Sequence, residues 1–129
     1  MRIHMSLGQR VPMLVGGVGR AFAAKLGLTE EELRSQFAML RWQSPIRFEE
    51  YLEQVEDARR RGYAIDRNNF AAGVTVIASA LCDARSTVGY GVSAIMFSGQ
   101  VDASGEAAIG EMLTEATDWA APLLVSTPV

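Results

Sequence analysis

The chain has 129 residues, and its 12 Lys and Arg against 15 Asp and Glu give it a net charge of −3. A composition that is 49% hydrophobic and 21% charged is typical of a folded globular chain, here one domain over residues 1–129, and excludes a disordered one. The lack of a basic surplus argues against DNA or RNA binding by this chain alone, because nucleic-acid binders neutralise phosphates with Lys and Arg.

The first part of the chain is predicted to contain a short strand and two helices. Apolar and polar residues alternate between residues 1 and 10, which is typical of a strand. A glycine-rich segment, Gly16–Gly19, then precedes a helical run from Arg20 to Leu26. Thr29 and Glu32 have the spacing of a capping box, in which each side chain accepts a hydrogen bond from the other residue's amide. This pair predicts the start of the second helix.

A third helix is predicted from the spacing of its apolar residues, which are Phe48, Tyr51, Leu52, Val55 and Ala58. It ends in Arg59–Arg61 followed by Gly62, a residue type that readily adopts the left-handed conformation that stops a helix. The three arginines have two interpretations, a phosphate-binding patch or charges that complement the negative end of the helix dipole. We favour the second.

The second half of the chain is predicted to form three strands and a final helix. The strands are Tyr63–Asp66, Val74–Cys82 and Tyr90–Phe97, and a polar connection of hairpin type joins the last two. Consecutive strands with short connections predict an antiparallel sheet, so the fold class is α+β with helices packed on the sheet. The last helix, about Ser104 to Ala121, is predicted to bury an apolar stripe of Ile109, Met112, Leu113, Ala116, Trp119 and Ala120.

Few residues are candidates for ligand contacts. The amides of Gly17, Val18 and Gly19 open a helix and could hold a carboxylate; the alternative is a tight turn that lets the helix approach the sheet closely. Asp66 stands at a strand end, where its side chain either turns into a cavity or closes an Asx turn with Asn68.

No catalytic set, metal site or cofactor is expected. Cys82 and His4 are the only residues of their types, which excludes an internal disulfide and a four-ligand structural zinc site. Cys82 ends an apolar run and is expected to be a small buried hydrophobe rather than a nucleophile. No stretch approaches the roughly 20 apolar residues of a membrane-spanning helix, so we expect a cytoplasmic location and no membrane partner.

Several short segments form a co-linear set between Gly8 and Leu124. They are Gly8–Met13 with Gly17–Ala21, Arg61–Asp66, Gly73–Ala78 and Ser98–Gly99. No single segment is specific, but their order and spacing together resemble the C-terminal effector-binding domain of IclR-type (isocitrate lyase regulator type) transcription regulators.

The resemblance implies a GAF-like fold with a pocket between the antiparallel sheet and the glycine loop. Such domains bind small organic acids or aromatic metabolites and couple occupancy of the pocket to a DNA-binding domain. Carried over to this sequence, the ligand-binding residues would be Gly17, Val18, Gly19, Asp66, Val74, Val76, Met96 and Ser98.

The chain departs from the family pattern at five positions: Leu14, Gly16 and Met96 each replace a polar residue, and Asn68 and Asn69 replace acidic ones. Asp66, Ser98 and the loop amides are left as polar anchors, and Asp66 would repel a carboxylate, so an apolar or aromatic ligand is favoured. Nothing in the chain resembles the family's winged helix-turn-helix or the first strands of its effector domain. DNA would therefore be bound only through a separate winged-helix domain.

Two functional classes follow. The first is a ligand-sensing and oligomerisation domain for a small organic or aromatic metabolite. The alternative is a non-catalytic interaction protein that pairs with itself or with a full-length regulator and binds no ligand. A homo-oligomer is expected because the apolar strands Val74–Cys82 and Tyr90–Phe97 lack the family's earlier strands, which leaves a sheet edge open. The predicted strand Arg2–Leu7 could pair across or exchange between copies.

Overall fold

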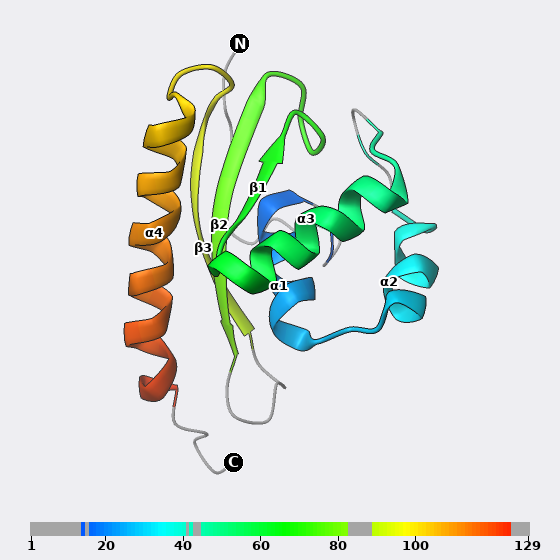
Figure 1. Ribbon diagram of the computed structural model, residues 1–129, viewed down its shortest axis with the longest axis horizontal. Helices are drawn as coiled ribbons and strands as arrows, with labels where there is room; N and C mark the ends of the chain where they lie inside the picture. The colour runs from blue at the N-terminus through cyan, green and yellow to red at the C-terminus, as the bar shows by residue number, and fades with distance from the viewer. Residues whose placement is uncertain (1–13, 15, 41, 43–44, 83–88, 125–129) are drawn as a thin grey trace.

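A three-stranded antiparallel sheet with helices on both faces forms the centre of the computed structural model, which describes residues 14, 16–40, 42, 45–82 and 89–124 (Figure 1). In chain order the elements are α1 (Gly16–Leu26), α2 (Glu30–Phe37), α3 (Phe48–Arg61), β1 (Ala64–Arg67), β2 (Val74–Cys82), β3 (Gly89–Phe97), α4 (Ala103–Ala120) and a 3-10 turn, η1 (Ala121–Leu123). The predicted α+β fold class is confirmed.

The strands lie in the order β1-β2-β3, with β2 in the middle. Ala64 of β1 pairs with Ala78 of β2, and β2 pairs with β3 along its whole length, from Val74 opposite Phe97 to Cys82 opposite Gly89. Because successive side chains on a strand point to opposite faces, this register fixes which residues share a face.

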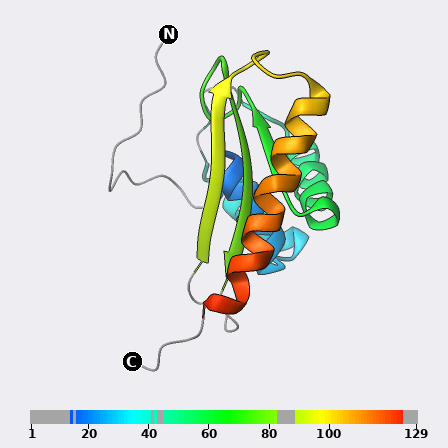
Figure 2. The same ribbon diagram turned by 90° about the vertical axis from the view of Figure 1, so that its left-hand side faces the viewer.

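Different helices cover the two faces of the sheet (Figures 1 and 2). On one face, which we call the α1 face, alanines of the sheet pack against alanines of α1 and α3, namely Ala64, Ala78 and Ala80 against Ala21 and Ala58. On the other, the α4 face, the sheet packs against α4 through Ile65, Ile77, Met96, Ile109 and Leu113. The small residues of the α1 face allow α1 and α3 to approach the sheet closely.

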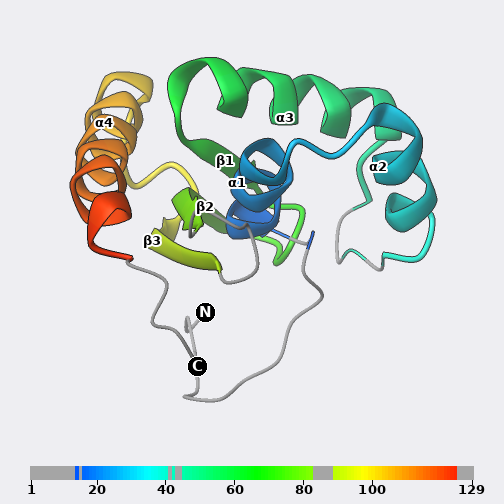
Figure 3. The same cartoon turned by 90° about the horizontal axis from the view of Figure 1, so that it is seen from below.

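Helix α2 lies beside one end of α3, away from the sheet (Figure 3). A separate aromatic cluster joins the two helices. Leu33 of α2 and Val55 of α3 are fully buried there. The ring of Phe37 lies 5.4 Å from that of Phe48 and 5.1 Å from that of Tyr51, between ring centroids. The cluster holds α2 in place although α2 does not touch the centre of the sheet.

The helix ends follow the sequence signals. Thr29 Oγ1 accepts a hydrogen bond from the Glu32 amide at 3.1 Å, and Glu32 Oε1 accepts one from the Thr29 amide at 3.4 Å, which confirms the capping box. Gly62 ends α3 with φ of 91°. Arg59 donates to the Leu28 carbonyl at 2.9 Å and Arg61 donates to the Tyr63 carbonyl at 3.1 Å. The side chains of these two arginines are therefore hydrogen-bonded to the backbone of the chain.

Some boundaries differ from the prediction. Helix α1 begins at Gly16 rather than Arg20, so the glycine segment is the first turn of the helix and not a loop before it. The predicted strand of residues 1–10 and the hairpin connection at 83–88 lie outside the described residues.

The predicted buried stripe of α4 is wrong in part. Met112 is 68% exposed and Trp119 is 74% exposed. The helix instead buries Gly110, which lies against the ring of Tyr63, and Thr117. Because Gly110 has no side chain, α4 can approach the Tyr63 ring on this side. The spacing of apolar residues alone does not show that this face of α4 is the one that packs on the sheet.

Candidate ligand-binding site

The α1 face carries a buried ion pair at the end of β1. Asp66 lies opposite Val76 of β2, and its Oδ2 accepts a hydrogen bond from Arg20 Nη1 of α1 at 2.7 Å. Both side chains have no exposed surface. Asp66 Oδ1 accepts from the amides of Asn69 and Phe70 at 3.0 and 3.2 Å, so the Asp66 side chain closes a turn and meets a cation at the same time.

Arg20 is the centre of this cluster. Its Nε donates to Gln54 Oε1 of α3 at 2.6 Å, its Nη1 also donates to the Gly16 carbonyl at 3.0 Å, and its Nη2 donates to Asn69 Oδ1 at 2.9 Å. With Asp66, these partners take four of the five N–H donors of a guanidinium.

Two aromatic rings flank the guanidinium. Arg20 Cζ lies 5.3 Å from the ring centroid of Trp42 and 5.4 Å from that of Tyr51, within the range of a cation–π contact. The Tyr51 hydroxyl donates to the Leu14 carbonyl at 3.0 Å. Burial raises the pKa of Tyr51 to about 12, and the Arg20 charge opposes part of that rise. Trp42 Nε1 is buried and has no hydrogen-bond partner among the described residues.

The structure brings five of the predicted ligand-binding residues to the α1 face, namely Gly17, Val18, Asp66, Val74 and Val76. Gly17 is packed directly on β2, since a Cβ there would lie 2.8 Å from the Val76 carbonyl oxygen. Gly19 is packed against Leu14, where a Cβ would lie 2.2 Å from the Leu14 carbonyl carbon. The glycines thus let α1 approach the sheet, which is the second of the two interpretations given above.

Met96 and Ser98 lie on the other side of the sheet, contrary to the pocket lining expected from the resemblance. Met96 is buried among the residues that contact α4. Ser98 Oγ donates to Asn68 Oδ1 at 2.7 Å and shares a hydrogen bond with Thr75 Oγ1 at 2.9 Å. The physical reason is register. Met96 pairs with Thr75, which faces α4, and Ser98, two residues further on and just beyond β3, has the same parity and pairs with Gly73 through its amide.

The residues that sequence reasoning missed are Arg20, Trp42, Tyr51, Gln54 and Asn69. Arg20 is the one charged residue between Gly16 and Ala24 of an otherwise apolar, glycine-rich stretch, and that signal was available. A charge in such a stretch is buried only when paired. The Arg20 partner on β1 is 46 residues away, however, and no local spacing identifies it.

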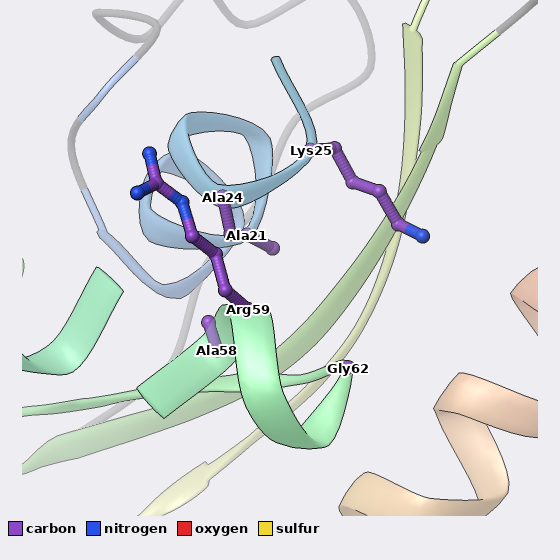
Figure 4. Close-up of a pocket in the computed structure, with 6 residues that line it drawn as sticks. All are labelled: Ala21, Ala24, Lys25, Ala58, Arg59 and Gly62. Atoms are coloured by element: carbon purple, nitrogen blue, oxygen red, sulfur yellow. The ribbon is translucent and has the colours of Figure 1, made fainter. Parts of the chain in front are cut away.

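A pocket of about 190 Å³ lies elsewhere, between the last turns of α1 and α3 (Figure 4). It is lined by Ala21, Ala24, Lys25, Ala58, Arg59 and Gly62. The side chains of Lys25 and Arg59 extend in different directions from its rim, so their charges do not converge on one point. None of the predicted ligand-binding residues lines it.

The described part of the chain contains no group of three or more His, Cys, Asp or Glu side chains placed to hold a metal ion. None of the helices between residues 14 and 124 that the structure describes has the length and apolarity needed to cross a membrane.

The fold is that of the effector domains of bacterial transcription regulators. The structure resembles the Agobacterium tumefaciens repressor BlcR with a TM-score of 0.79 and 22% identity, covering 93% of this chain and 49% of that one. It resembles the IclR of Thermotoga maritima with a TM-score of 0.73 and 19% identity, covering 90% and 48%. A third similar structure is the inducer-binding domain of PobR from Acinetobacter in complex with 3-hydroxybenzoic acid, with a TM-score of 0.68, 16% identity and coverage of 96% and 75%.

The family profile described as bacterial transcriptional regulator IclR C-terminal matches residues 1–120. The chain therefore belongs to the IclR family of transcription regulators and corresponds to their effector-binding region.

The chain is 34% identical over 104 residues to the HTH-type transcriptional repressor AllR of Escherichia coli K12, and 35% identical over the same length to AllR of Salmonella typhimurium. These matches cover 77% of this chain and 36% of each repressor, so the chain spans about a third of the length of these curated relatives. The relatives are regulators and not enzymes.

Proposed function

We propose that this chain is a non-catalytic, ligand-sensing and self-associating domain of a transcription regulator, and that its ligand carries a carboxylate or another hydrogen-bond acceptor. Family membership supports the sensing role. The observation that carries the ligand class is the buried indole N–H of Trp42, whose Nε1 has no acceptor among the described residues and which lies beside the Arg20 guanidinium.

The charges around Asp66 are compatible with an acidic ligand. From the sequence, Asp66 was expected to repel a carboxylate. In the structure, Arg20 neutralises its charge at 2.7 Å, and the amides of Asn69 and Phe70 bind its other oxygen. A buried donor that lacks an acceptor is costly, about 1 to 3 kcal/mol, and an acceptor on a ligand would remove that cost. The ring of Trp42, which is only partly buried, would pack on an apolar or aromatic body.

The PobR domain gives this proposal a concrete probe. That protein is in complex with 3-hydroxybenzoic acid, an aromatic acid. For this chain, isothermal titration of 3-hydroxybenzoate and of short aliphatic acids, each beside its uncharged amide, tests the class. We expect at least one acid to bind and its amide to bind more weakly.

A pair of tryptophan variants tests the site. Trp42→Phe keeps a ring but removes the free donor, and we expect about 3- to 10-fold weaker binding of that acid, which corresponds to the loss of one hydrogen bond. Trp119→Phe makes the same change at the other tryptophan, which is 74% exposed on α4, and is expected to leave binding unchanged. Equal losses in both variants, or no binding by any acid, would refute the proposal.

The alternative function is pairing with itself or with a full-length regulator without a ligand. It is favoured if the chain self-associates and no acid in the series binds. The observation behind it is the exposure of β3, where Tyr90 is 53% and Val92 is 40% exposed. DNA binding is proposed to depend on a separate winged-helix domain, because the net charge here is −3.

A further inference from the structure

We infer that Asn69 determines the charge of the ligand that the candidate site accepts. Its neutral side chain leaves the cluster around Arg20 without a net charge, so that an anionic ligand can approach Trp42. This inference rests on the proposed function, because it concerns the ligand whose acceptor would meet the Trp42 indole.

Asn69 lies in the turn after β1 and contacts both members of the buried ion pair. Its amide donates to Asp66 Oδ1 at 3.0 Å, and its side-chain Oδ1 accepts from Arg20 Nη2 at 2.9 Å. The guanidinium therefore binds a carboxylate through Nη1 and an amide oxygen through Nη2. Because a carboxylate accepts the same hydrogen bond as an amide oxygen, geometry alone does not require Asn at this position.

The charges within the cluster cancel. Arg20 contributes one positive charge and Asp66 one negative charge, and neither side chain has any exposed surface. The other two side chains that accept from the guanidinium, Gln54 and Asn69, are neutral amides. A carboxylate at position 69 would give the cluster a net charge of one negative unit, in a place where water screens charge poorly.

Position 69 is close enough to Trp42 for such a charge to act on a ligand there. Arg20 Cζ lies 5.3 Å from the Trp42 ring centroid, and Asn69 Oδ1 is bonded to a nitrogen of the same guanidinium. Asn69 Oδ1 and the ring are therefore at most about 10 Å apart. Two like charges at about 10 Å and an effective dielectric constant of about 20 change an affinity roughly 10-fold.

The neighbouring Asn68 offers a matched comparison. Its Oδ1 accepts from the Gly73 amide at 2.9 Å and from the Ser98 hydroxyl at 2.7 Å, so its side chain is bonded to these groups and not to the guanidinium. Asn68 is exposed, whereas Asn69 is half-buried. A charge at position 68 is therefore screened by solvent.

Asn69→Asp tests the inference through the preference for an acid over its amide. The probes are 3-hydroxybenzoate with 3-hydroxybenzamide and short aliphatic acids with their amides, each measured by isothermal titration. We expect Asn69→Asp to bind the acid about 5- to 20-fold more weakly than the wild type does, because of like-charge repulsion. Its affinity for the amide should stay within about 2-fold, and Asn68→Asp should change neither affinity by more than about 2-fold.

Two further variants separate charge from structure. Asn69→Ser shortens the side chain and loses the bond to Arg20 but adds no charge, so it should keep the wild-type ratio of acid affinity to amide affinity. The double variant Asp66→Asn with Asn69→Asp moves the carboxylate to the other nitrogen of the guanidinium and restores a neutral cluster. We expect the ratio to recover in that variant, whereas damage to the fold would add up.

The outcomes distinguish this inference from the function on which it rests. A wild type that binds none of the acids overturns both. A wild type that binds an acid, together with an unchanged ratio in Asn69→Asp, overturns only the role of Asn69. An equal fall of the ratio in Asn69→Ser or in Asn68→Asp also overturns it, since the effect would then not arise from a charge beside Arg20.

Discussion

Asp66 and Arg67 are neighbours on β1, yet they form two very different ion pairs. Their side chains point to opposite faces of the sheet, so Asp66 meets Arg20 of α1 and Arg67 meets Glu106 of α4. In the first pair neither side chain has any exposed surface. In the second, the Arg67 side chain is 57% exposed and the Glu106 side chain 10%. Strand β1 thus forms an ion pair with α1 in the interior and another with α4 at the surface.

The difference shows that separation alone does not set the contribution of an ion pair. The two N···O distances are 2.7 and 2.5 Å, so the geometry is similar. Water can replace the partner of Arg67 but cannot reach Arg20. Removing one member of a buried pair leaves an unpaired charge in the interior, whereas removing one member of an exposed pair leaves a hydrated charge.

The largest expected effect is that of Asp66→Asn. It removes the negative charge beside Arg20 with almost no change in volume, and we expect the free energy of unfolding to fall by about 3 to 5 kcal/mol. Urea denaturation measures this loss. Asp57→Asn makes the same change in an exposed pair with Arg60 and is expected to cost less than about 1 kcal/mol.

A double variant checks the cause. If the loss in Asp66→Asn arises from the stranded charge of Arg20, then Arg20→Met in the same chain should restore part of the stability. A double variant that is less stable than the sum of the two single losses would contradict this account. It would instead assign the effect to the hydrogen bonds from Arg20 to Gln54 and Asn69.

The next effect concerns Tyr51, which lies against the same guanidinium. Its pKa is about 12 in the folded chain against 10.0 for an ordinary tyrosine. The folded state therefore holds the phenolic proton more tightly than the unfolded state. The stabilising contribution is complete below pH 10 and is lost as the pH rises to about 12, a change of about 2 to 3 kcal/mol.

Tyr51→Phe isolates this contribution. At about pH 9 the variant is expected to be less stable than the wild type, because it lacks the bond from the Tyr51 hydroxyl to the Leu14 carbonyl. Toward pH 12 the wild type should lose stability faster and the difference should shrink. Urea denaturation at both pH values measures it, and a constant difference would show that Tyr51 ionises freely.

The same comparison shows how much the sequence could predict. The β-branched residues of Val74–Cys82, with Gly73 before them and Asp83 after them, predicted β2 with its bounds, because a buried central strand has a strong local pattern. The capping box and Gly62 likewise predicted helix ends through interactions within four residues. The exposure of β3 was not visible in its sequence, because both strands are apolar and only their place in the sheet differs.

The candidate site was predicted in part. Asp66, Gly17 and Val76 were expected to lie together and do so, because the family resemblance contains the long-range information that spacing lacks. The role of Arg20 depends on contacts with α3 and β1 that fold from distant segments. Local patterns do not encode such contacts, and a charged residue on a helix is ordinarily assigned to solvent.

The smallest effect should come from Glu106→Gln, which breaks the other pair of the comparison. Arg67 stays hydrated when its partner is lost, so we expect the free energy of unfolding to fall by no more than about 1 kcal/mol at low salt. The loss should shrink as sodium chloride is added, since salt screens an exposed pair and has little access to a buried one. Glu111→Gln on the same helix has no ion-pair partner among the described residues and provides the baseline for the change of side chain. Urea denaturation of both variants at low and high salt measures the difference.

A salt-independent loss as large as that of Asp66→Asn would contradict this account. It would mean that the burial of Glu106, whose side chain is 10% exposed, sets the strength of this ion pair whatever the exposure of Arg67. The contrast between the two faces of β1 would then disappear.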